Sequence, residues 1–300
     1  GQNLSPNQLI RVDGQIMAVA MMVNTQHLMY REDILSDLGI ETPTTWDEVF
    51  AAADKIKEAG VVDHPIGATM KSGWNLAQEF VNMYPGFGGT FFNDDNTTAV
   101  NSDAGMQALA TMKKTLDYTD PEVLVSDSTY VQQQFQQGKI AMANLWASRA
   151  GAMNDENESQ VVGKVKMAAA PMAVAGNAPA TTLWWDGIVI AANISDEEAD
   201  AAFRLAMEGL DADMVTGANE AAIWLVNGYV PGDLAQGAIA TATANPAPPP
   251  YPSTTQMGLL HTALGNELPA FLTGERDAEA TLVAIDEAYT TAAKEAGVLE

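Results

Sequence analysis

A tryptophan lies close to an amide and a carboxylate in the segment that begins at Trp74. Asn75 follows this tryptophan directly, and Glu79 follows about one helical turn later. An indole offers a flat apolar face, whereas amides and carboxylates form hydrogen bonds with hydroxyl groups. Together these groups can hold a small molecule with both apolar C–H faces and hydroxyl groups, as sugars and polyols have. A structural anchor at a helix start is an equally good reading of Trp74.

Trp184, Trp185 and Asp186 form a second segment of this kind. Adjacent residues in a strand point to opposite faces, so at most one of the two indoles faces a bound molecule while the other packs against the protein. Asp186 could accept hydrogen bonds from hydroxyl groups or cap a turn, and we favour the first role.

A polar run from Asn24 to His27 interrupts an apolar region. Polar groups in such a place must be satisfied by protein, water or ligand. We therefore take Asn24, Gln26 and His27 as further candidate ligand contacts, although a lone histidine is more often structural.

The composition argues against several other kinds of site. The 300 residues include no cysteine and only three histidines, which are far apart, so neither thiolate ligands nor a closely spaced histidine pair is present. We expect no metal, no cofactor and no catalytic residue. The net charge of -25 repels phosphate backbones and anionic headgroups, so we expect no nucleic-acid partner. The longest apolar runs are too short to cross a bilayer.

An enzyme of the glycoside hydrolase class is the main alternative, because such an enzyme needs two carboxylates across a sugar-binding cleft. Asp186 and Glu79 could form that pair, but 39 acidic residues make a chance pair easy to find. No nucleophile elbow, P-loop or dinucleotide-binding glycine motif supports another chemistry. A lectin or chemoreceptor-type binding protein that works without a transporter is a third possibility.

The elements that position these residues alternate between strands and helices. Thr45 and Glu48 form a capping box at the start of a helix expected over 46–60. The unbroken apolar run 16–23 predicts a strand buried on both faces, as in a parallel sheet. Five prolines in 245–252 predict a stiff extended crossing between two bodies. Further helices are expected near 74–83, 102–118, 128–137, 199–210, 255–264 and 278–293, and further strands near 28–30, 91–92, 139–143, 165–170 and 187–191. This alternation is typical of an α/β fold with a mostly parallel sheet.

Several segments, in order along the chain, resemble the extracellular solute-binding proteins of family 1, the sugar-type periplasmic binding proteins of ABC importers. The most specific segment runs from Tyr30 to Glu48 and includes Pro43-Thr44-Thr45-Trp46-Asp47-Glu48. The others are Phe87 to Ser102, Phe135 to Trp146, Trp184 to Ile190, and Leu272-Thr273-Gly274-Glu275 between two helices near the C-terminus. Together they cover nearly the whole chain.

The resemblance implies a periplasmic-binding-protein-like fold of type II, in which two α/β lobes are joined by extended crossings. It places 1–23 and 187–244 in lobe 1, and 24–183 and 250–300 in lobe 2. The crossings are expected near 20–26, 183–187 and 244–252. Family members usually begin with about a hundred more residues, a domain-size estimate, so we expect lobe 1 to be incomplete in this sequence.

The resemblance further implies a substrate-binding component of an ABC importer, which captures a small polar solute by closing two lobes. Trp146 lies at the motif position that stacks on sugar in several members, although core packing after a strand would also explain a tryptophan there. The implied partners are a small-molecule ligand, most simply a sugar or polyol, and the ABC permease subunits. A monomer in the periplasm or another extracytoplasmic compartment is expected.

Overall fold

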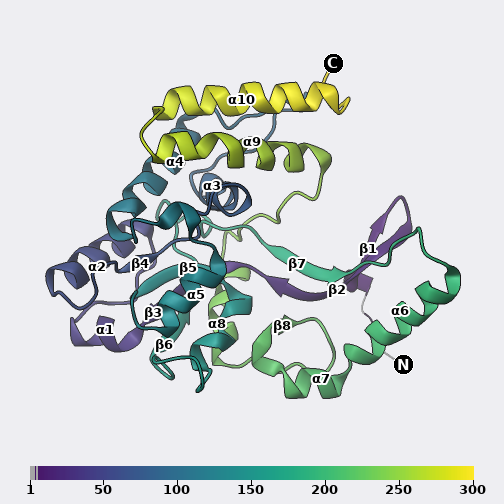
Figure 1. Cartoon of the computed structure of the whole chain (residues 1–300), viewed down its shortest axis with the longest axis horizontal. Coiled ribbons are helices and arrows are strands. Elements are labelled where there is room, and N and C mark those ends of the chain that lie inside the picture. Colours follow the sequence, from purple (N-terminus) through teal and green to yellow (C-terminus); the bar gives the residue numbers. More distant parts are fainter. Residues whose placement is uncertain (1–3, 5) are drawn as a thin grey trace.

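The computed structural model describes residue 4 and residues 6–300. This part of the chain forms two bodies, each built around a four-stranded sheet (Figure 1). The helices are α1 (Glu32–Asp37), α2 (Trp46–Glu58), α3 (Trp74–Gly86), α4 (Asp103–Thr115), α5 (Ser128–Gln136), α6 (Asp196–Gly209), α7 (Ala212–Gly217), α8 (Gln236–Ala242), α9 (Thr255–Leu272) and α10 (Ala278–Glu295). The strands are β1 (Leu9–Val12), β2 (Gln15–Asn24), β3 (Gln26–Arg31), β4 (Ile66–Gly67), β5 (Met142–Trp146), β6 (Val165–Ala168), β7 (Trp184–Ile188) and β8 (Ile223–Trp224).

The larger body contains the sheet β4-β5-β3-β6, in which β3 is antiparallel to both of its neighbours and β4 is parallel to β5. Helices α9 and α10 lie side by side beyond α3 (Figure 1). The main apolar core joins these helices to α2, α4 and one face of the sheet, and Phe80, Leu109, Leu264 and Tyr289 are fully buried in it.

The capping box at the start of α2 is confirmed. The Glu48 backbone N–H donates to Thr45 Oγ1 at 3.2 Å, and the Thr45 N–H donates to Glu48 Oε2 at 3.2 Å. These bonds satisfy two backbone donors that a helix start otherwise leaves without partners, which is why the helix begins at Trp46.

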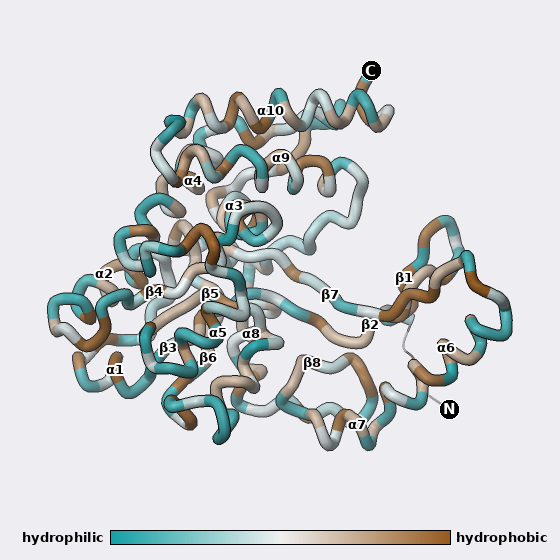
Figure 2. The backbone as a smooth tube through the Cα atoms, viewed as in Figure 1, coloured by the Kyte–Doolittle hydropathy of each residue, from teal (hydrophilic) through white to brown (hydrophobic). Residues whose placement is uncertain are grey.

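The smaller body contains β1, β2 and β7 in that order, with β8 also paired to β2. Every pairing in this sheet is antiparallel, so the mostly parallel sheet predicted from the sequence is wrong. The apolar run of β2 is not buried on both faces of the sheet. Burial alternates from Ala18 to Met22, and Ile16 and Met17 are about half exposed. Figure 2 shows the hydrophobic stretches of β1 and β2 at this end of the molecule.

Three chain segments connect the bodies: the turn between β2 and β3, the residues just before β7, and the stretch between β8 and α8, because α8 packs on the larger body. Thr25, between β2 and β3, lies within 3.2 Å of Thr181 through the two Oγ1 atoms. Leu183, just before β7, donates its N–H to the Pro249 carbonyl and accepts from the Tyr251 N–H, each at 2.9 Å. The proline-rich segment joins α8 to α9 within the larger body, so it is not the crossing that the sequence predicted, and it is hydrogen-bonded to the second connection at Leu183.

Two features differ from the sequence-based expectations. Residues 91–92 form no named strand, because only an isolated bridge joins Phe92 to Thr98. Helix α8 was not predicted, and its residues, which we expected in lobe 1, pack on β3 and β6 of the larger body. Gly237 makes this contact possible, since a Cβ there would lie 2.7 Å from the Ala168 carbonyl oxygen.

Candidate functional site

Three of the predicted site tryptophans meet where the two bodies join. Trp74 begins α3, Trp146 ends β5 and Trp184 begins β7. The ring centroids of Trp74 and Trp146 are 6.4 Å apart, and that of Trp184 lies 5.8 Å from Trp74 and 5.9 Å from Trp146. Trp74 is 50% exposed and the other two indoles are partly buried, so the group has apolar ring surface that a ligand could cover.

Two residues that were not among the predicted site residues, Tyr251 and His261, complete this aromatic group. The Tyr251 ring stacks on Trp184 at 4.0 Å between centroids, and the His261 ring stacks on Trp74 at 5.0 Å. Tyr251 lies in the proline-rich segment, which the sequence predicted to be a crossing. An aromatic residue in a predicted crossing could therefore have been recognised as a candidate site residue. His261 lies on α9, and only the packing of α9 against α3 brings it here.

A buried carboxyl group lies in the same region. Gln26 Nε2 donates to Glu79 Oε1 at 3.1 Å, and the Thr69 hydroxyl donates to the same oxygen. Burial raises the pKa of Glu79 to about 7, while the two hydrogen bonds act in the opposite direction. Asn144 Nδ2 approaches Gln26 Oε1 at 3.5 Å. The predicted candidates Gln26 and Glu79 are thus direct partners.

A second polar group connects α3 to Trp184. Thr182 Oγ1 accepts from Trp184 Nε1 at 3.0 Å and from Gln78 Nε2 at 3.1 Å, and it donates to Asn82 Oδ1 at 2.9 Å. Within the described chain, Gln78 Oε1, Asn82 Nδ2 and Asn144 Oδ1 are buried without a hydrogen-bond partner. Buried polar atoms are almost always satisfied, so these three are places for water or for a polar ligand group.

Asn24 and Asp186 also lie together. Asn24 Nδ2 is 3.2 Å from Ser148 Oγ and 3.4 Å from Asp186 Oδ2. Asp186 is two residues after Trp184 in β7, and alternate residues of a strand share a face. Asp186 and Trp184 therefore lie on one side of the sheet, and Asn24 connects this side to the end of β5.

Three predicted site residues remain: His27 and Trp185 point away from the aromatic group, and Asn75 lies beside it. His27 is fully buried, and its Nδ1 lies 2.8 Å from the position that a Cβ on Gly237 would take, so it lies under α8. It neighbours Gln26 in β3 and points to the opposite face, away from Glu79. Trp185 is 37% exposed and points away from Trp184. Asn75 is partly buried beside Trp74 at the start of α3.

His27 therefore contacts the protein interior and does not join the aromatic group. Burial lowers its pKa to about 4, which keeps the ring neutral near pH 7. The sequence placed it among polar neighbours, but the two-residue period of the strand separates it from Gln26. Trp185 is separated from Trp184 for the same reason, as the alternation predicted.

Within the residues that the structure describes, no cluster of three or more histidine, cysteine, aspartate or glutamate side chains has the arrangement of a metal site. None of the helices in this described part of the chain combines the length and the apolarity that a membrane crossing requires.

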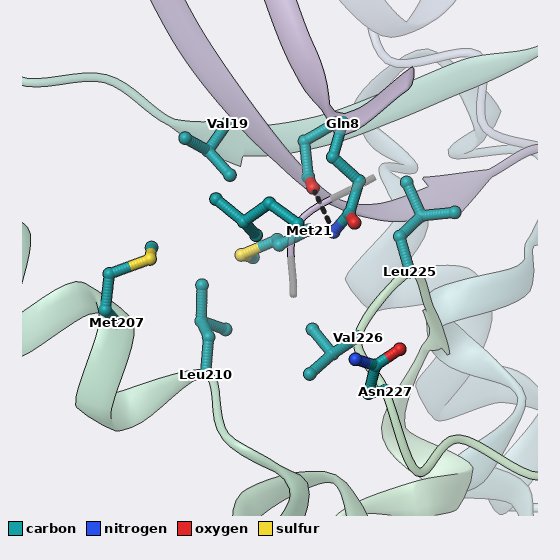
Figure 3. Close-up of a pocket in the computed structure, with 10 residues that line it drawn as sticks. Gln8, Val19, Met21, Met207, Leu210, Leu225, Val226 and Asn227 are labelled. Atoms are coloured by element: carbon teal, nitrogen blue, oxygen red, sulfur yellow. Dashed lines mark hydrogen bonds between the residues drawn. The ribbon is translucent and has the colours of Figure 1, made fainter. Parts of the chain in front are cut away.

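A separate pocket lies on the smaller body (Figure 3). Val19 and Met21 of β2 face Met207 and Leu210 from α6 and the residue after it. Gln8 donates to the Ala20 carbonyl at 3.3 Å at its edge. The described lining residues are apolar or neutral, without an aromatic or charged side chain, so this pocket lacks the combination found at the body junction.

Comparisons with known proteins agree with this architecture. Residues 5–263 match the family model described as bacterial extracellular solute-binding protein. A protein of Deinococcus radiodurans named "Probable ABC transporter-binding protein" is 26% identical over 198 residues, which is 63% of this chain and 46% of that protein. A protein of Brucella abortus named as a binding protein is 25% identical over 198 residues, 65% of this chain and 46% of its own length. The chain thus spans about half of the length of these curated relatives.

Solved structures share the fold over almost the whole chain. The maltose-bound MalE3 of T. maritima has a TM-score of 0.82 at 23% identity, covering 96% of this chain and 76% of that one. An ABC transporter solute-binding protein of Agrobacterium vitis S4 with bound D-mannitol has a TM-score of 0.83 at 21% identity, covering 99% and 79%. These similarities confirm the predicted two-lobed, periplasmic-binding-protein-like α/β fold.

Proposed function

Because the chain belongs to the bacterial extracellular solute-binding protein family, we propose that it is the substrate-binding component of an ABC importer and that it captures a sugar or polyol. The observation that carries this proposal is the junction of the two bodies. There, Trp74, Trp146 and Trp184 form an aromatic group beside buried amide and carboxyl groups.

This combination suits a neutral polyhydroxylated ligand. Indole faces cover the apolar C–H surface of such a molecule, and a few placed polar groups set its orientation. Structurally similar proteins have been solved with ribitol, D-mannitol, α-D-tagatose and maltose bound. We assign ligand contact to Trp74, Trp146, Trp184, Asp186, Asn24, Asn75 and the Gln26–Glu79 pair. His27 and Trp185 are left out of this set because they point away from it.

Binding would close the two bodies about their three connections. The contact of Thr25 with Thr181 joins the first two connections, and the contact of Leu183 with Tyr251 joins the second to the proline-rich segment, so a hinge there would move these segments as a unit. A ligand that contacts both bodies binds the closed form more tightly and therefore shifts the population toward it. No covalent step is part of this function.

We propose lobe boundaries that differ from the expected ones only from α8 onward. Lobe 1 comprises residues up to 23 and 187–235, and lobe 2 comprises 24–183 and 236–300. Because α8 packs on β3 and β6, we move it from lobe 1 to lobe 2.

The proposed partners are the permease subunits of the importer, which would read the closed form. The proposed location is outside the cytoplasmic membrane, in keeping with the family's extracellular description. The net charge of -25 favours neither nucleic acid nor an anionic membrane surface as a partner, and we propose a monomer.

A thermal-shift screen of sugars, polyols, sugar acids and amines tests the ligand class. A bound ligand at a hundred times its Kd adds about 2.7 kcal/mol of stability, so a true ligand produces a clear shift. We expect a shift with at least one sugar or polyol. A shift with an amine and with none of the polyhydroxylated compounds would overturn the assignment.

A hydrolysis assay with aryl-glycosides tests the enzyme alternative. We expect no turnover. Steady hydrolysis that is abolished in both Asp186→Asn and Glu79→Gln would show that these carboxylates act as the pair of a glycoside hydrolase.

A further inference from the structure

We propose that His261 and Tyr251 are positioning residues of the ligand site, which hold the indoles of Trp74 and Trp184 in fixed planes before a ligand arrives. The proposal rests on the proposed function for its consequence in binding. The positioning itself can be measured in the protein without ligand.

His261 contacts Trp74 in two ways. Its ring stacks on the indole at 5.0 Å with an interplanar angle of 26°, and its Nε2 lies 3.0 Å from the Trp74 carbonyl oxygen. The residue is 5% exposed, so it is held by the protein, whereas Trp74 is 50% exposed. A buried ring thus supports the exposed indole from the protein side.

The hydrogen bonds of His261 determine its tautomer. A carbonyl oxygen only accepts, so Nε2 must carry the proton that it donates to Trp74. Nδ1 is then the acceptor, and the Tyr251 hydroxyl, 3.1 Å away, donates to it. Burial lowers the pKa of His261, which favours this neutral form.

Tyr251 extends the same chain of contacts to the second indole. Its ring stacks on Trp184 at 4.0 Å with an angle of 28°. Trp184 is further fixed by the bond from its Nε1 to Thr182 Oγ1. Trp74 and Trp184 are therefore linked through His261 and Tyr251, although they come from different elements.

The backbone places His261 at this distance. Gly265 lies one turn after His261 on α9, and a Cβ on Gly265 would lie 2.8 Å from the Gly73 carbonyl oxygen and 3.0 Å from its Cα. Only glycine permits so close an approach between α9 and the residue before Trp74. Gly73 itself has a φ of 92°, which favours glycine. The two glycines therefore bring the histidine ring against the indole.

Near-UV circular dichroism of the ligand-free protein tests the positioning directly. His261→Gln removes the ring but keeps a donor and an acceptor, and Tyr251→Phe keeps the ring but removes the hydroxyl. We expect both to change the indole signal toward that of Trp74→Ala, with an unchanged far-UV spectrum. His64→Gln is the matched control, because it makes the same substitution at a histidine that is partly buried in another loop, and it should leave the indole signal as in the wild type.

Binding measurements then test whether His261 acts through Trp74. The probe is whichever of D-mannitol, ribitol, D-tagatose and maltose binds the wild type most tightly by calorimetry. His261→Phe keeps a stacking ring but loses the hydrogen bond to the Trp74 carbonyl, and we expect about five-fold weaker binding, the effect of one net hydrogen bond. In the Trp74→Ala background the same substitution should change binding by less than about two-fold, because the residue it positions is gone.

The outcomes separate this proposal from the proposed function. An unchanged indole signal in both His261→Gln and Tyr251→Phe overturns the positioning role, whatever binds. An equal loss of affinity from His261→Phe with and without Trp74 also overturns it. If none of the four compounds binds the wild type, the ligand assignment fails, and the dichroism result alone decides on positioning.

Discussion

Replacing the buried Glu79 by glutamine should change the pH dependence of stability in a defined direction. Glutamine has nearly the same shape, and its Oε1 can still accept from Gln26 and Thr69. The buried carboxyl has a pKa raised from 4.5 to about 7. Between these values the folded state binds more protons than the unfolded state, so the wild type loses stability as the pH rises.

The size of this effect follows from the shift. About 2.5 pKa units at 1.36 kcal/mol per unit give about 3 kcal/mol, because the ionised carboxylate is poorly solvated where it lies. This contribution is fully present below pH 4.5 and is lost as the pH rises through 7. Glu79→Gln has no such loss. Its stability relative to the wild type should therefore rise by about 3 kcal/mol between pH 4.5 and pH 8.

Urea unfolding at a series of pH values measures this difference, because all other titrating groups are common to both proteins. Glu48→Gln is a matched control of opposite sign. Hydrogen bonds from Thr44 lower the pKa of Glu48, so that variant should lose stability relative to the wild type as the pH rises. A stability difference for Glu79→Gln that is flat or falls with pH would show that burial does not raise the pKa of Glu79 in the folded protein.

Three further perturbations follow from local geometry. Thr45→Ala removes the cap of α2 and should lower the free energy of unfolding by about 1 kcal/mol in urea titrations. The pKa of His27 is lowered to about 4 in the folded protein, so between pH 4 and 6.5 this residue binds fewer protons there than in the unfolded chain. The free energy of unfolding should therefore fall by up to about 3 kcal/mol on acidification through this window. His27→Leu should remove this contribution to the pH dependence of stability. Gly237→Ala places a methyl group 2.7 Å from a carbonyl oxygen and should lower the melting temperature. Gly258→Ala is the control, because a Cβ there meets open space and the residue lies in α9. It should leave the melting temperature unchanged or raise it.

Local signals in the sequence predicted local structure well. The capping box at Thr45 involves residues three apart, so its geometry depends little on the rest of the fold. The opposite orientation of Trp184 and Trp185 follows from strand alternation alone. The meeting of Trp74, Trp146 and Trp184 was anticipated because the resemblance supplied the missing long-range information.

Long-range packing was the part that the sequence did not reveal. The apolar run of β2 is compatible with several sheet arrangements, and composition alone does not distinguish a strand buried on both faces from one with a half-exposed face. His27 was grouped with Gln26 because they are adjacent, although adjacency in a strand means opposite faces. His261 could not be identified because its role depends on the close contact of Gly265 with Gly73, between segments almost two hundred residues apart.

We propose that a polyhydroxylated ligand binds on the indoles of Trp74, Trp146 and Trp184. The chain has six tryptophans, so an NMR spectrum of ¹⁵N-labelled indoles resolves the site from the rest of the protein in one titration. Addition of a sugar or polyol that shifts melting should move the resonances of these three and leave those of Trp46, in the core, and Trp224, bonded to the Ala218 carbonyl, in place. Movement confined to Trp46, Trp185 or Trp224 would contradict the account.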